Sequence, residues 1–533
     1  MFSTSKGFPF SDPLVQAIQN NLKFEQSTSV QAESFSAIAT NNDVLIRSCT
    51  GSGKSLAFLL PILDHIIAGD SNRSSGIQAL VLSPTRELAL QLQSVCNSLL
   101  KSFPGIVCGC IVGGDKRKSE KARIRKGFHI LISTPGRLRD HFDRTANLSS
   151  SLESLSFIVL DEADQLLDQG FYPQIKFILE QVNQLKVVQR ILVSATLTSK
   201  VLALVNESLH DPIIVDCSSK SGNQEELIVD EYEIPETVEQ LFTTVDLRSR
   251  FPSLVGILAN EIEKCERGLN VVPKIIVFVF SCVHVDFIHT ILSQLSSQLD
   301  TPFSYFKNSN FSALHGDLDM IERRKTMDKF RQNPNPSILI ATDVAARGLD
   351  ISNVTTVIQY DPPCSFENYV HRIGRSGRIG NSGRSVLVLN THEKDFIQHL
   401  GQKGVVVDYL EIENVVKSLC AKFEEKVKGP RKRLSFLDCC RRLQSVADEE
   451  VAKNDGLTAL ARQSYQSFIS AYNTFPKELR PFFNKKLLHL GHVCKSFCLK
   501  DSPSTVSSSL RKVVKENRKR TAGANSRGKR GRR

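Results

Sequence analysis

The fold of this chain is decided first by a glycine-rich stretch, Ile46-Arg47-Ser48-Cys49-Thr50-Gly51-Ser52-Gly53-Lys54-Ser55. It follows an apolar run and opens a helical pattern, which is where a buried strand turns into a helix. Backbone N–H groups of such a loop surround phosphate oxygens, Lys54 neutralises their charge, and the Ser55 hydroxyl can bind Mg²⁺. The strict pattern has glycine where this chain has Ser48, and a glycine-rich turn with an incidental lysine is the alternative. The stretch therefore predicts a phosphate-binding loop.

A second segment, Asp161-Glu162-Ala163-Asp164, places acidic side chains directly after the apolar run Phe157 to Leu160. Carboxylates at a strand end suit a metal and phosphate site, in which Asp161 would hold Mg²⁺ through water and Glu162 would orient or deprotonate an attacking water. An acid-rich helix N-terminus is the alternative, and the phosphate loop upstream argues against it. Ser194-Ala195-Thr196, after the next apolar run, is either a pair of hydroxyl caps or a relay from this site. Together the loop and the acidic segment predict hydrolysis of a nucleoside triphosphate.

The segment His371 to Arg378 carries three arginines and one histidine within eight residues. Arginines that are distant along the chain from a phosphate loop suit closure onto a phosphate during its transfer. Each of them taken singly could instead lie on a solvated face. In combination with the loop, the segment predicts a second part of the nucleotide site.

Short β-branched runs alternate with longer helical patterns along two stretches of the chain, which predicts parallel sheets covered by helices on both faces. The expected buried strands are Asp43–Ile46, Ala79–Leu82, Ile130–Ile132, Phe157–Leu160 and Ile191–Val193, then Ile275–Phe280, Ile338–Ile340, Val354–Tyr360 and Val386–Leu389. Strands fade after about Gln402, and helical spacing dominates from Glu413 through Phe497. We therefore expect two α/β domains, 1–216 and 236–400, joined by a linker, 217–235, and followed by a helical region, 401–502, and a basic disordered tail, 503–533.

Composition narrows the class of protein. The chain has 533 residues and a formal net charge of +12, but Arg511 to Arg533 alone holds eleven Lys or Arg and one acidic residue. This tail is either an RNA-binding and nuclear-retention arm or a plain solubilising tail. No apolar run of eighteen residues occurs and the N-terminus lacks a signal-peptide pattern, so we expect a soluble intracellular protein with no membrane segment. The thirteen cysteines lack the paired spacing of a zinc site and are expected to be reduced and mostly buried.

The motifs and their order resemble the DEAD-box RNA helicases, and the resemblance runs from about Phe8 to Leu400. It implies two RecA-like domains that use ATP and Mg²⁺ and grip the backbone of RNA. Arg, Thr and exposed N–H groups suit such a grip, because phosphate contacts position the nucleic acid without reading its bases. The residues implied for RNA binding are Pro84, Thr85, Arg86, Gly114, Thr134, Pro135, Gly136, Arg137, His315, Gly316, Arg323 and Thr342. The family tends to have Gln in place of Met320, which bears on one further RNA contact.

The resemblance also implies the residues of the ATP site. Gln31 matches the glutamine that reads adenine, although Ser27 stands where the family usually has proline. Phe8, in preference to Phe10, matches the aromatic residue that stacks on the base, and Asp350 belongs to the nucleotide-binding set. The implied catalytic residues are Glu162, Asp161, Arg375, Arg378 and His371, with Arg375 and Arg378 reaching the γ-phosphate as an arginine finger.

Two segments of the helical region, Phe468 to Tyr472 and Leu490 to Phe497, resemble an accessory region of nucleolar DEAD-box helicases. With Ser48 and the residues around Gln31, they resemble the branch that includes DEAD-box protein seven. This branch implies a monomer of the nucleus and nucleolus that acts on precursor ribosomal RNA, together with pre-ribosomal proteins, during large-subunit assembly. One alternative is an ATP-gated RNA clamp or assembly factor, which has the same motifs. The other is a DNA helicase, for which the motif set is a poor match.

Overall fold

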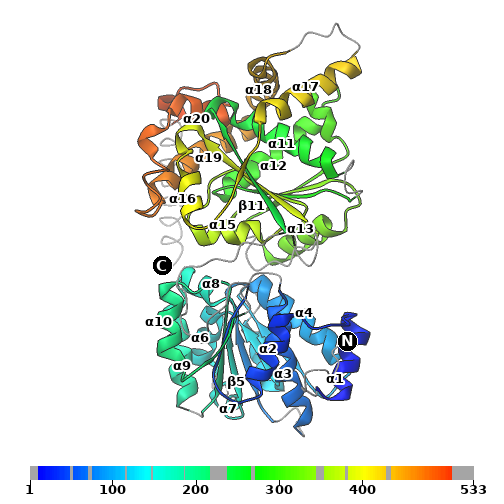
Figure 1. Cartoon of the computed structure of the whole chain (residues 1–533), viewed down its shortest axis with the longest axis vertical. Helices are drawn as coiled ribbons and strands as arrows, with labels where there is room; N and C mark the ends of the chain where they lie inside the picture. The colour runs from blue at the N-terminus through cyan, green and yellow to red at the C-terminus, as the bar shows by residue number, and fades with distance from the viewer. Residues whose placement is uncertain are drawn as a thin grey trace, which may run out of the picture. The chain divides into compact units, whose positions relative to one another are not determined.

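The chain forms two compact units, and the boundary between them along the sequence falls between Pro235 and Glu236. Figure 1 shows the computed structural model, in which each unit is a sheet with helices on its faces. The structure describes residues 10–48, 52–69, 75–113, 117–145, 148–184, 187–216, 237–265, 271–343, 353–377, 382–427 and 434–506. Among these described residues, no helix is both long and apolar enough to cross a membrane.

The first unit is built on a seven-stranded parallel sheet with the strand order β3-β4-β2-β5-β6-β1-β7. The strands are β1 (Val44–Arg47), β2 (Ala79–Leu82), β3 (Cys108–Ile111), β4 (Ile130–Ser133), β5 (Phe157–Leu160), β6 (Gln189–Ser194) and β7 (Ile213–Asp216). Because all strands run the same way, their carboxyl ends meet at one edge of the sheet, which is where ligands bind in such folds.

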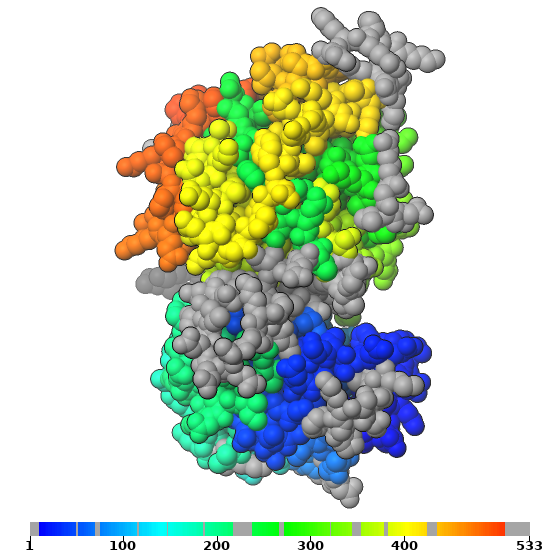
Figure 2. Space-filling view, viewed as in Figure 1, coloured from blue at the N-terminus to red at the C-terminus, as the bar shows by residue number. Residues whose placement is uncertain are grey.

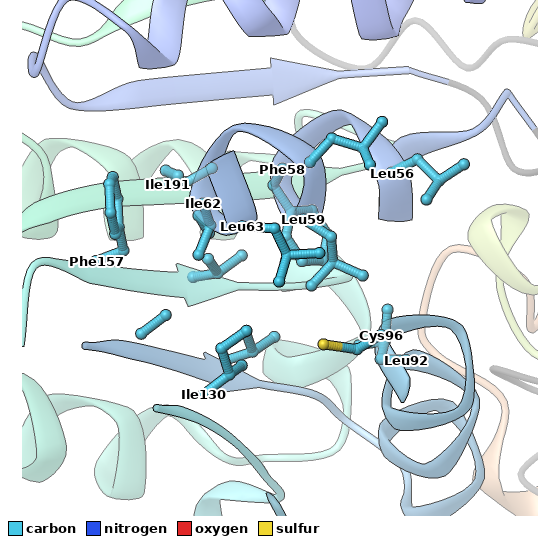
Figure 3. Packing of buried hydrophobic residues seen from close by; sticks show 14 of the residues in the cluster. Leu56, Phe58, Leu59, Ile62, Leu63, Leu92, Cys96, Ile130, Phe157 and Ile191 are labelled. Atoms are coloured by element: carbon cyan, nitrogen blue, oxygen red, sulfur yellow. The ribbon is translucent and has the colours of Figure 1, made fainter. Parts of the chain in front are cut away.

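Alternate residues of these strands enter two separate hydrophobic cores, one on each face of the sheet. Val44 and Ile46 of β1 join one core while Leu45 joins the other. The first core is closed by α1 (Asp12–Ala17), α2 (Ser29–Ile38), α3 (Lys54–Ala68) and α4 (Arg86–Leu100), and Figure 3 shows side chains of α3 and α4 against the sheet. The second is closed by α5 (Arg117–Lys126), α6 (Pro135–Arg144), α7 (Leu148–Ser151), α8 (Ala163–Asp168), α9 (Tyr172–Asn183) and α10 (Ser199–Ser208). Burial on both faces explains why the strands read as continuous apolar runs.

The second unit repeats this plan with the parallel strand order β10-β11-β9-β12-β13-β8-β14. Its strands are β8 (Val238–Val245), β9 (Lys274–Phe278), β10 (Asn310–Leu314), β11 (Ser337–Ala341), β12 (Thr356–Gln359), β13 (Gly383–Asn390) and β14 (Asp408–Tyr409). Its helices are α11 (Arg250–Lys264), α12 (Cys282–Ser296), α13 (Met320–Gln332), α15 (Phe366–Ile373) and α16 (Phe396–Gln402).

A helical extension completes the second unit. It consists of α17 (Ile412–Val427), α18 (Phe436–Lys453), α19 (Asp455–Thr474) and α20 (Leu490–Ser496). α17 packs along α11 and α19 packs along α12, and Figure 2 shows the orange surface of the extension lying directly against the yellow and green surface of the unit. The expected fold class, two parallel-sheet domains with a helical extension, is therefore confirmed.

Asp361, two residues after the end of β12, joins the sheet to the helices that carry the extension. Its carboxylate accepts hydrogen bonds from Arg250 of α11 at 2.7 Å and from the Phe280 amide at 2.8 Å, and it lies 2.9 Å from His284 Nδ1 of α12. Burial alone would raise the pKa of this carboxyl, but the neighbouring His284 and Arg250 outweigh it and hold the pKa below its usual value. Asp361 is fully buried, so its charge is stable only in the presence of these partners.

Several elements differ from the sequence-based expectation. Strands β3, β7, β8, β10 and β14 were not predicted, and β14 follows Gln402, where strands were expected to fade. β3 reads Cys-Gly-Cys-Ile, in which Gly109 makes room for the Phe128 ring that a Cβ there would meet at 2.3 Å. Residues 503–506 form a helical turn, so the first residues of the expected disordered tail are ordered, and residues 507–533 lie outside the described residues.

We predict that Asp361→Asn lowers the free energy of unfolding by about 3–5 kcal/mol at neutral pH, because it leaves the buried Arg250 charge unpaired. The stabilisation by the Asp361 carboxylate is complete above the ordinary pKa of aspartate and is lost as pH falls through its lowered folded-state pKa. The gap between the wild-type chain and the variant should therefore shrink in acid. Urea unfolding followed by circular dichroism over a pH series measures this gap.

The matched control is Asp246→Asn, since Asp246 pairs with Arg248 on the surface and its side chain is 46% exposed. It should change the free energy of unfolding by less than about 0.5 kcal/mol. A gap for Asp361→Asn that does not vary with pH would contradict the assigned role of the carboxylate.

Candidate nucleotide and RNA sites

The phosphate loop begins where β1 ends at the carboxyl edge of the first sheet. The Ser48 amide donates to the Ser194 carbonyl of the adjacent strand at 3.2 Å, and the Ser48 hydroxyl donates to Ser52 Oγ at 2.7 Å. Lys54 is buried and its ammonium donates to the Ser48 carbonyl at 2.7 Å. Ser48, which replaces the usual glycine, thus contacts the other end of the loop twice, through its hydroxyl to Ser52 and through its carbonyl to Lys54. Thr50 and Gly51 lie outside the described residues, while Ser55 is half-buried in the first turn of α3.

Gln31 lies against the same loop. It is 4% exposed and belongs to a capping box at the start of α2, where its side-chain oxygen accepts from the Thr28 amide at 3.1 Å. Its amide nitrogen donates to the Gly53 carbonyl at 3.2 Å, which connects α2 to the loop. A primary amide has four hydrogen-bonding positions, so these two contacts leave two for a base. Phe8 lies outside the described residues, and Phe10, the other candidate for base stacking, packs edge-on against Phe35 at 4.7 Å.

The acidic segment follows β5 at the same edge. Asp161 is buried, and its pKa is raised to about 8, first by burial and then by the charge of Glu162, with the Lys54 ammonium acting in the opposite direction. Glu162 adopts a left-handed backbone conformation, φ 48° and ψ 57°. Its buried Oε2 atom has no hydrogen-bond partner within the described part of the chain. Two adjacent carboxylates with an unsatisfied oxygen fit a divalent cation and its water ligands.

Ser194-Ala195-Thr196 contacts the acidic segment from the neighbouring strand β6. The Thr196 hydroxyl donates to Asp164 Oδ2 at 3.0 Å, and the Ser194 hydroxyl donates to the Thr196 carbonyl at 2.7 Å. The Thr196 bond joins β6 to the acidic segment, whereas the Ser194 bond is local, so the role of this segment as a relay stays a prediction.

The candidate RNA residues of the first unit follow the adjacent strands β2 and β4. Thr85 caps α4 by accepting from the Leu88 amide at 3.2 Å, and Thr134 precedes Pro135 at the start of α6. Arg86 is exposed, and a Cβ at Gly113 would come within 2.7 Å of its guanidinium. Glycine at 113 therefore lets the arginine lie flat against the backbone. Gly114 lies outside the described residues.

Arg137 is already engaged within the first unit. Its guanidinium makes bonds of 2.8 and 2.7 Å to Glu120 Oε2, and Glu120 is fully buried. His141 Nε2 lies 3.0 Å from the same oxygen. The structure thus places Arg137 at the predicted segment but with its charge neutralised by a carboxylate, and contact with RNA by this residue stays a prediction.

In the second unit, His315 and Thr342 follow the adjacent strands β10 and β11. Thr342 is buried and its amide donates to the Leu314 carbonyl at 3.3 Å. His315 is buried and its Nε2 lies 3.1 Å from Asp286 Oδ1. Gly316 has open space where a Cβ would be, and Arg323 is half-buried in α13, the helix that Met320 begins. One sheet edge therefore brings these predicted residues into proximity.

The segment from His371 ends helix α15, and His371 and Arg375 are both buried. Arg375 Nε donates to the His371 carbonyl at 3.2 Å. Arg372, which the sequence-based set omits, makes two bonds of 2.6 and 2.8 Å to Asp343. Its place beside His371 in the same motif is the signal that could have found it. Arg378 and Asp350 lie outside the described residues.

Tandem parallel sheets with a phosphate loop and an acidic strand end in the first define a RecA-like P-loop NTPase of two domains. A family model described as DEAD/DEAH box helicase matches residues 28–204, and one described as helicase conserved C-terminal domain matches residues 260–380. A third, the C-terminal extension of SPB4-like ATP-dependent rRNA helicases, matches residues 454–505.

Relatives narrow the class further. The DEAD-box ATP-dependent RNA helicase 17 of Oryza sativa subsp. japonica is 34% identical over 94% of this chain and 91% of its own length. The ATP-dependent DNA helicase DDX31 of Homo sapiens is 39% identical over 95% of this chain, and the ATP-dependent RNA helicase DBP7 of Yarrowia lipolytica is 36% identical over 94%. The chain spans 62% and 65% of the length of these last two. The chain belongs to the DEAD-box ATP-dependent RNA helicases.

Solved structures of the family match this chain over most of its length. The DEAD-box helicase Mss116 bound to ssRNA and UDP-BeF matches with a TM-score of 0.75 and 26% identity over 93% of this chain and 90% of that one. Dbp5 of S. cerevisiae, bound to RNA and ADP BeF3, matches with a TM-score of 0.61 and 25% identity, covering 79% of this chain and 98% of that one. The predicted family, including the branch with the DBP7 name, is confirmed.

We predict that Gly53→Ala raises the dissociation constant for ATP by roughly tenfold or more. Gly53 has φ +95°, which strains any L side chain, and a Cβ there would lie 2.4 Å from the Gln31 amide nitrogen. The substitution should therefore displace both Gln31 and the loop. Titration with a fluorescent ATP analogue measures the effect. Gly105→Ala is the matched control, because nothing lies within 4 Å of its Cβ position, and equal affinities for the two variants would contradict the prediction.

Proposed function

We propose that this chain hydrolyses ATP when RNA is bound and uses the cycle to separate short RNA duplexes or to remodel RNA–protein complexes. The observation that carries the proposal is the placement of two segments. The phosphate loop follows β1 and the acidic segment follows β5 at the carboxyl edge of one parallel sheet, where Lys54 and Asp161 are both buried and the Lys54 charge opposes the rise in the pKa of Asp161. A loop that binds phosphate and a carboxylate pair that binds a cation then face the same ligand.

Each residue has a role in this proposal. Lys54 and the loop amides bind the β- and γ-phosphates, and Gln31 recognises the adenine. Ser55 and Asp161 would hold Mg²⁺, which when bound neutralises phosphate charge. Glu162 orients the attacking water and accepts its proton. Arg375, Arg378 and His371 complete the site when ATP and RNA close the two domains, with Arg375 and Arg378 neutralising charge that develops on the γ-phosphate, and Asp350 joins the nucleotide contacts.

RNA is the proposed polymer substrate, held through its backbone by the threonines and arginines at the strand ends of both units. Low base specificity follows from such contacts. Two observations favour testing other activities, namely those of an RNA clamp and of a DNA helicase. The motifs are equally compatible with an ATP-gated clamp, and the Homo sapiens and Dictyostelium discoideum relatives named DDX31 are described as DNA helicases.

ATPase stimulation separates these substrates. Single-stranded RNA and DNA of matched sequence are added to the purified chain, and release of phosphate is measured. We expect RNA to stimulate and DNA to stimulate weakly. Stronger stimulation by DNA would overturn the RNA assignment. Unwinding of short duplexes, compared with ATP-dependent retention of single strands, then separates a helicase from a clamp.

The cellular setting that we propose is maturation of the large ribosomal subunit in the nucleolus. The match of residues 454–505 to the extension of rRNA helicases supports precursor ribosomal RNA as the target, and the DBP7 relatives support the branch. We propose that the chain acts as a monomer among pre-ribosomal proteins. Crosslinking to cellular RNA followed by sequencing tests this setting, and peaks spread over messenger RNA would overturn it.

We predict that Glu162→Gln keeps ATP binding and lowers turnover by at least about 100-fold, because an amide cannot accept the proton of the attacking water. Equilibrium binding of a fluorescent ATP analogue and RNA-stimulated phosphate release measure the two quantities separately. Glu153→Gln, at an exposed carboxylate of the same unit, is the control and should leave both unchanged. Normal turnover in Glu162→Gln would refute the role of Glu162.

A further inference from the structure

A buried guanidinium lies where the helical extension meets the second sheet. Arg250, the first residue of α11, is 1% exposed. Its guanidinium carbon is 4.5 Å from the centroid of the Tyr360 ring and 5.0 Å from that of Phe468. Phe468 belongs to α19 of the extension and is itself 1% exposed. The extension therefore supplies one of the two rings that lie against this charge.

Direct contacts connect Arg250, through other residues of the second unit, to the segment His371 to Arg378, here called the arginine motif. Its Nη2 donates to Asp361 Oδ1 at 2.7 Å and also to the Tyr360 carbonyl. The backbone carbonyl of Asp361 accepts from Arg372 Nη1 at 2.7 Å. Asp361 thus bonds one arginine through its side chain and the other through its main chain, so a shift of Arg250 displaces the acceptor of Arg372.

Arg372 fixes the end of α15 that carries the predicted catalytic residues. It is 1% exposed, lies over the Phe278 ring at 5.0 Å, and holds Asp343 with two bonds. His371 precedes it in the chain, and Arg375 bonds the His371 carbonyl. The placement of His371 and Arg375 therefore depends on where the Arg372 guanidinium is held.

We infer that Phe468 is a positioning residue for ATP hydrolysis, acting through Arg250 and Asp361 on Arg372 and so on His371 and Arg375. The inference rests on the proposed function of those two residues. A ring face over a desolvated guanidinium attracts it and excludes water, and a buried ion pair keeps its geometry only while water is excluded. The extension in this way tunes the arginine motif without contacting nucleotide.

A purely structural role for the extension is the competing explanation. Other aromatic residues also attach it to the second unit: the Tyr472 hydroxyl donates to Glu393 at 2.6 Å, and the Phe483 ring lies 4.9 Å from the Phe396 ring of α16. Phe483 is fully buried and is not among the rings beside Arg250. It provides a matched control, since its loss weakens packing of the extension but removes neither ring that lies against Arg250.

The test compares Phe468→Leu with Phe483→Leu in the full chain, below the measured unfolding transition of each. Phe468→Leu should lower kcat of RNA-stimulated ATP hydrolysis roughly fivefold and leave KM for ATP within about twofold, because a cation–π contact is lost while the ATP-binding loop lies in the other unit. Phe483→Leu should lose comparable thermal stability and keep kcat.

Arg250→Lys, which keeps the charge but not the planar fork, should reproduce the loss of kcat. Combining it with Phe468→Leu should add little further loss, since both act on one contact. Equal kcat for Phe468→Leu, Phe483→Leu and the unaltered chain would overturn this inference alone. Absence of RNA-stimulated hydrolysis in the unaltered chain would overturn the proposed function and this inference with it.

Discussion

Burial of Asp161 beside Glu162 and Lys54 is the electrostatic constraint on which the first unit depends. Burial raises the pKa of the Asp161 carboxyl first, and the charge of the neighbouring Glu162 raises it further. The Lys54 ammonium offsets part of this rise, but Lys54 is also bonded to the Ser48 carbonyl. We therefore expect a cation and phosphate bound at the carboxyl edge of the sheet to favour the charged form of the Asp161 carboxyl.

In the second unit the constraint is the burial of arginine charges. Arg250 and Arg372 lie in the interior, and each donates hydrogen bonds to an aspartate. Asp361 serves Arg250 and Arg372, while Asp343 serves Arg372 from the other side. Aromatic rings also lie against both guanidinium groups, Tyr360 and Phe468 at Arg250 and Phe278 at Arg372. Buried ion pairs contribute little net stability, but leaving one partner unpaired is costly, so each of these arginines is held beside its carboxylate.

Much of the fold could be predicted from the sequence, because strands that are buried on both faces read as continuous apolar runs. Ala79–Leu82 and Phe157–Leu160 were located to the residue. Two of the strands that were not predicted lack a continuous apolar run. β3 contains Gly109 beside the Phe128 ring, and β8 has Glu239, Gln240 and threonines among its apolar residues. Motif order located the phosphate loop and acidic segment, which the structure brings to one sheet edge. It could not show that Arg137 is neutralised by Glu120, since that pairing crosses seventeen residues of chain.

The left-handed backbone of Glu162 has an evolutionary consequence. Non-glycine residues in this conformation cost about 1 kcal/mol or more, and glycine or asparagine adopts it more easily than glutamate. Random substitution at this position can therefore increase fold stability while removing the carboxylate. Selection for folding alone would drift away from glutamate here, so a lineage that retained the fold as a scaffold but no longer needed catalysis would lose this side chain early. On the catalytic role that we propose for Glu162, the identity of residue 162 thus records whether that chemistry is still under selection.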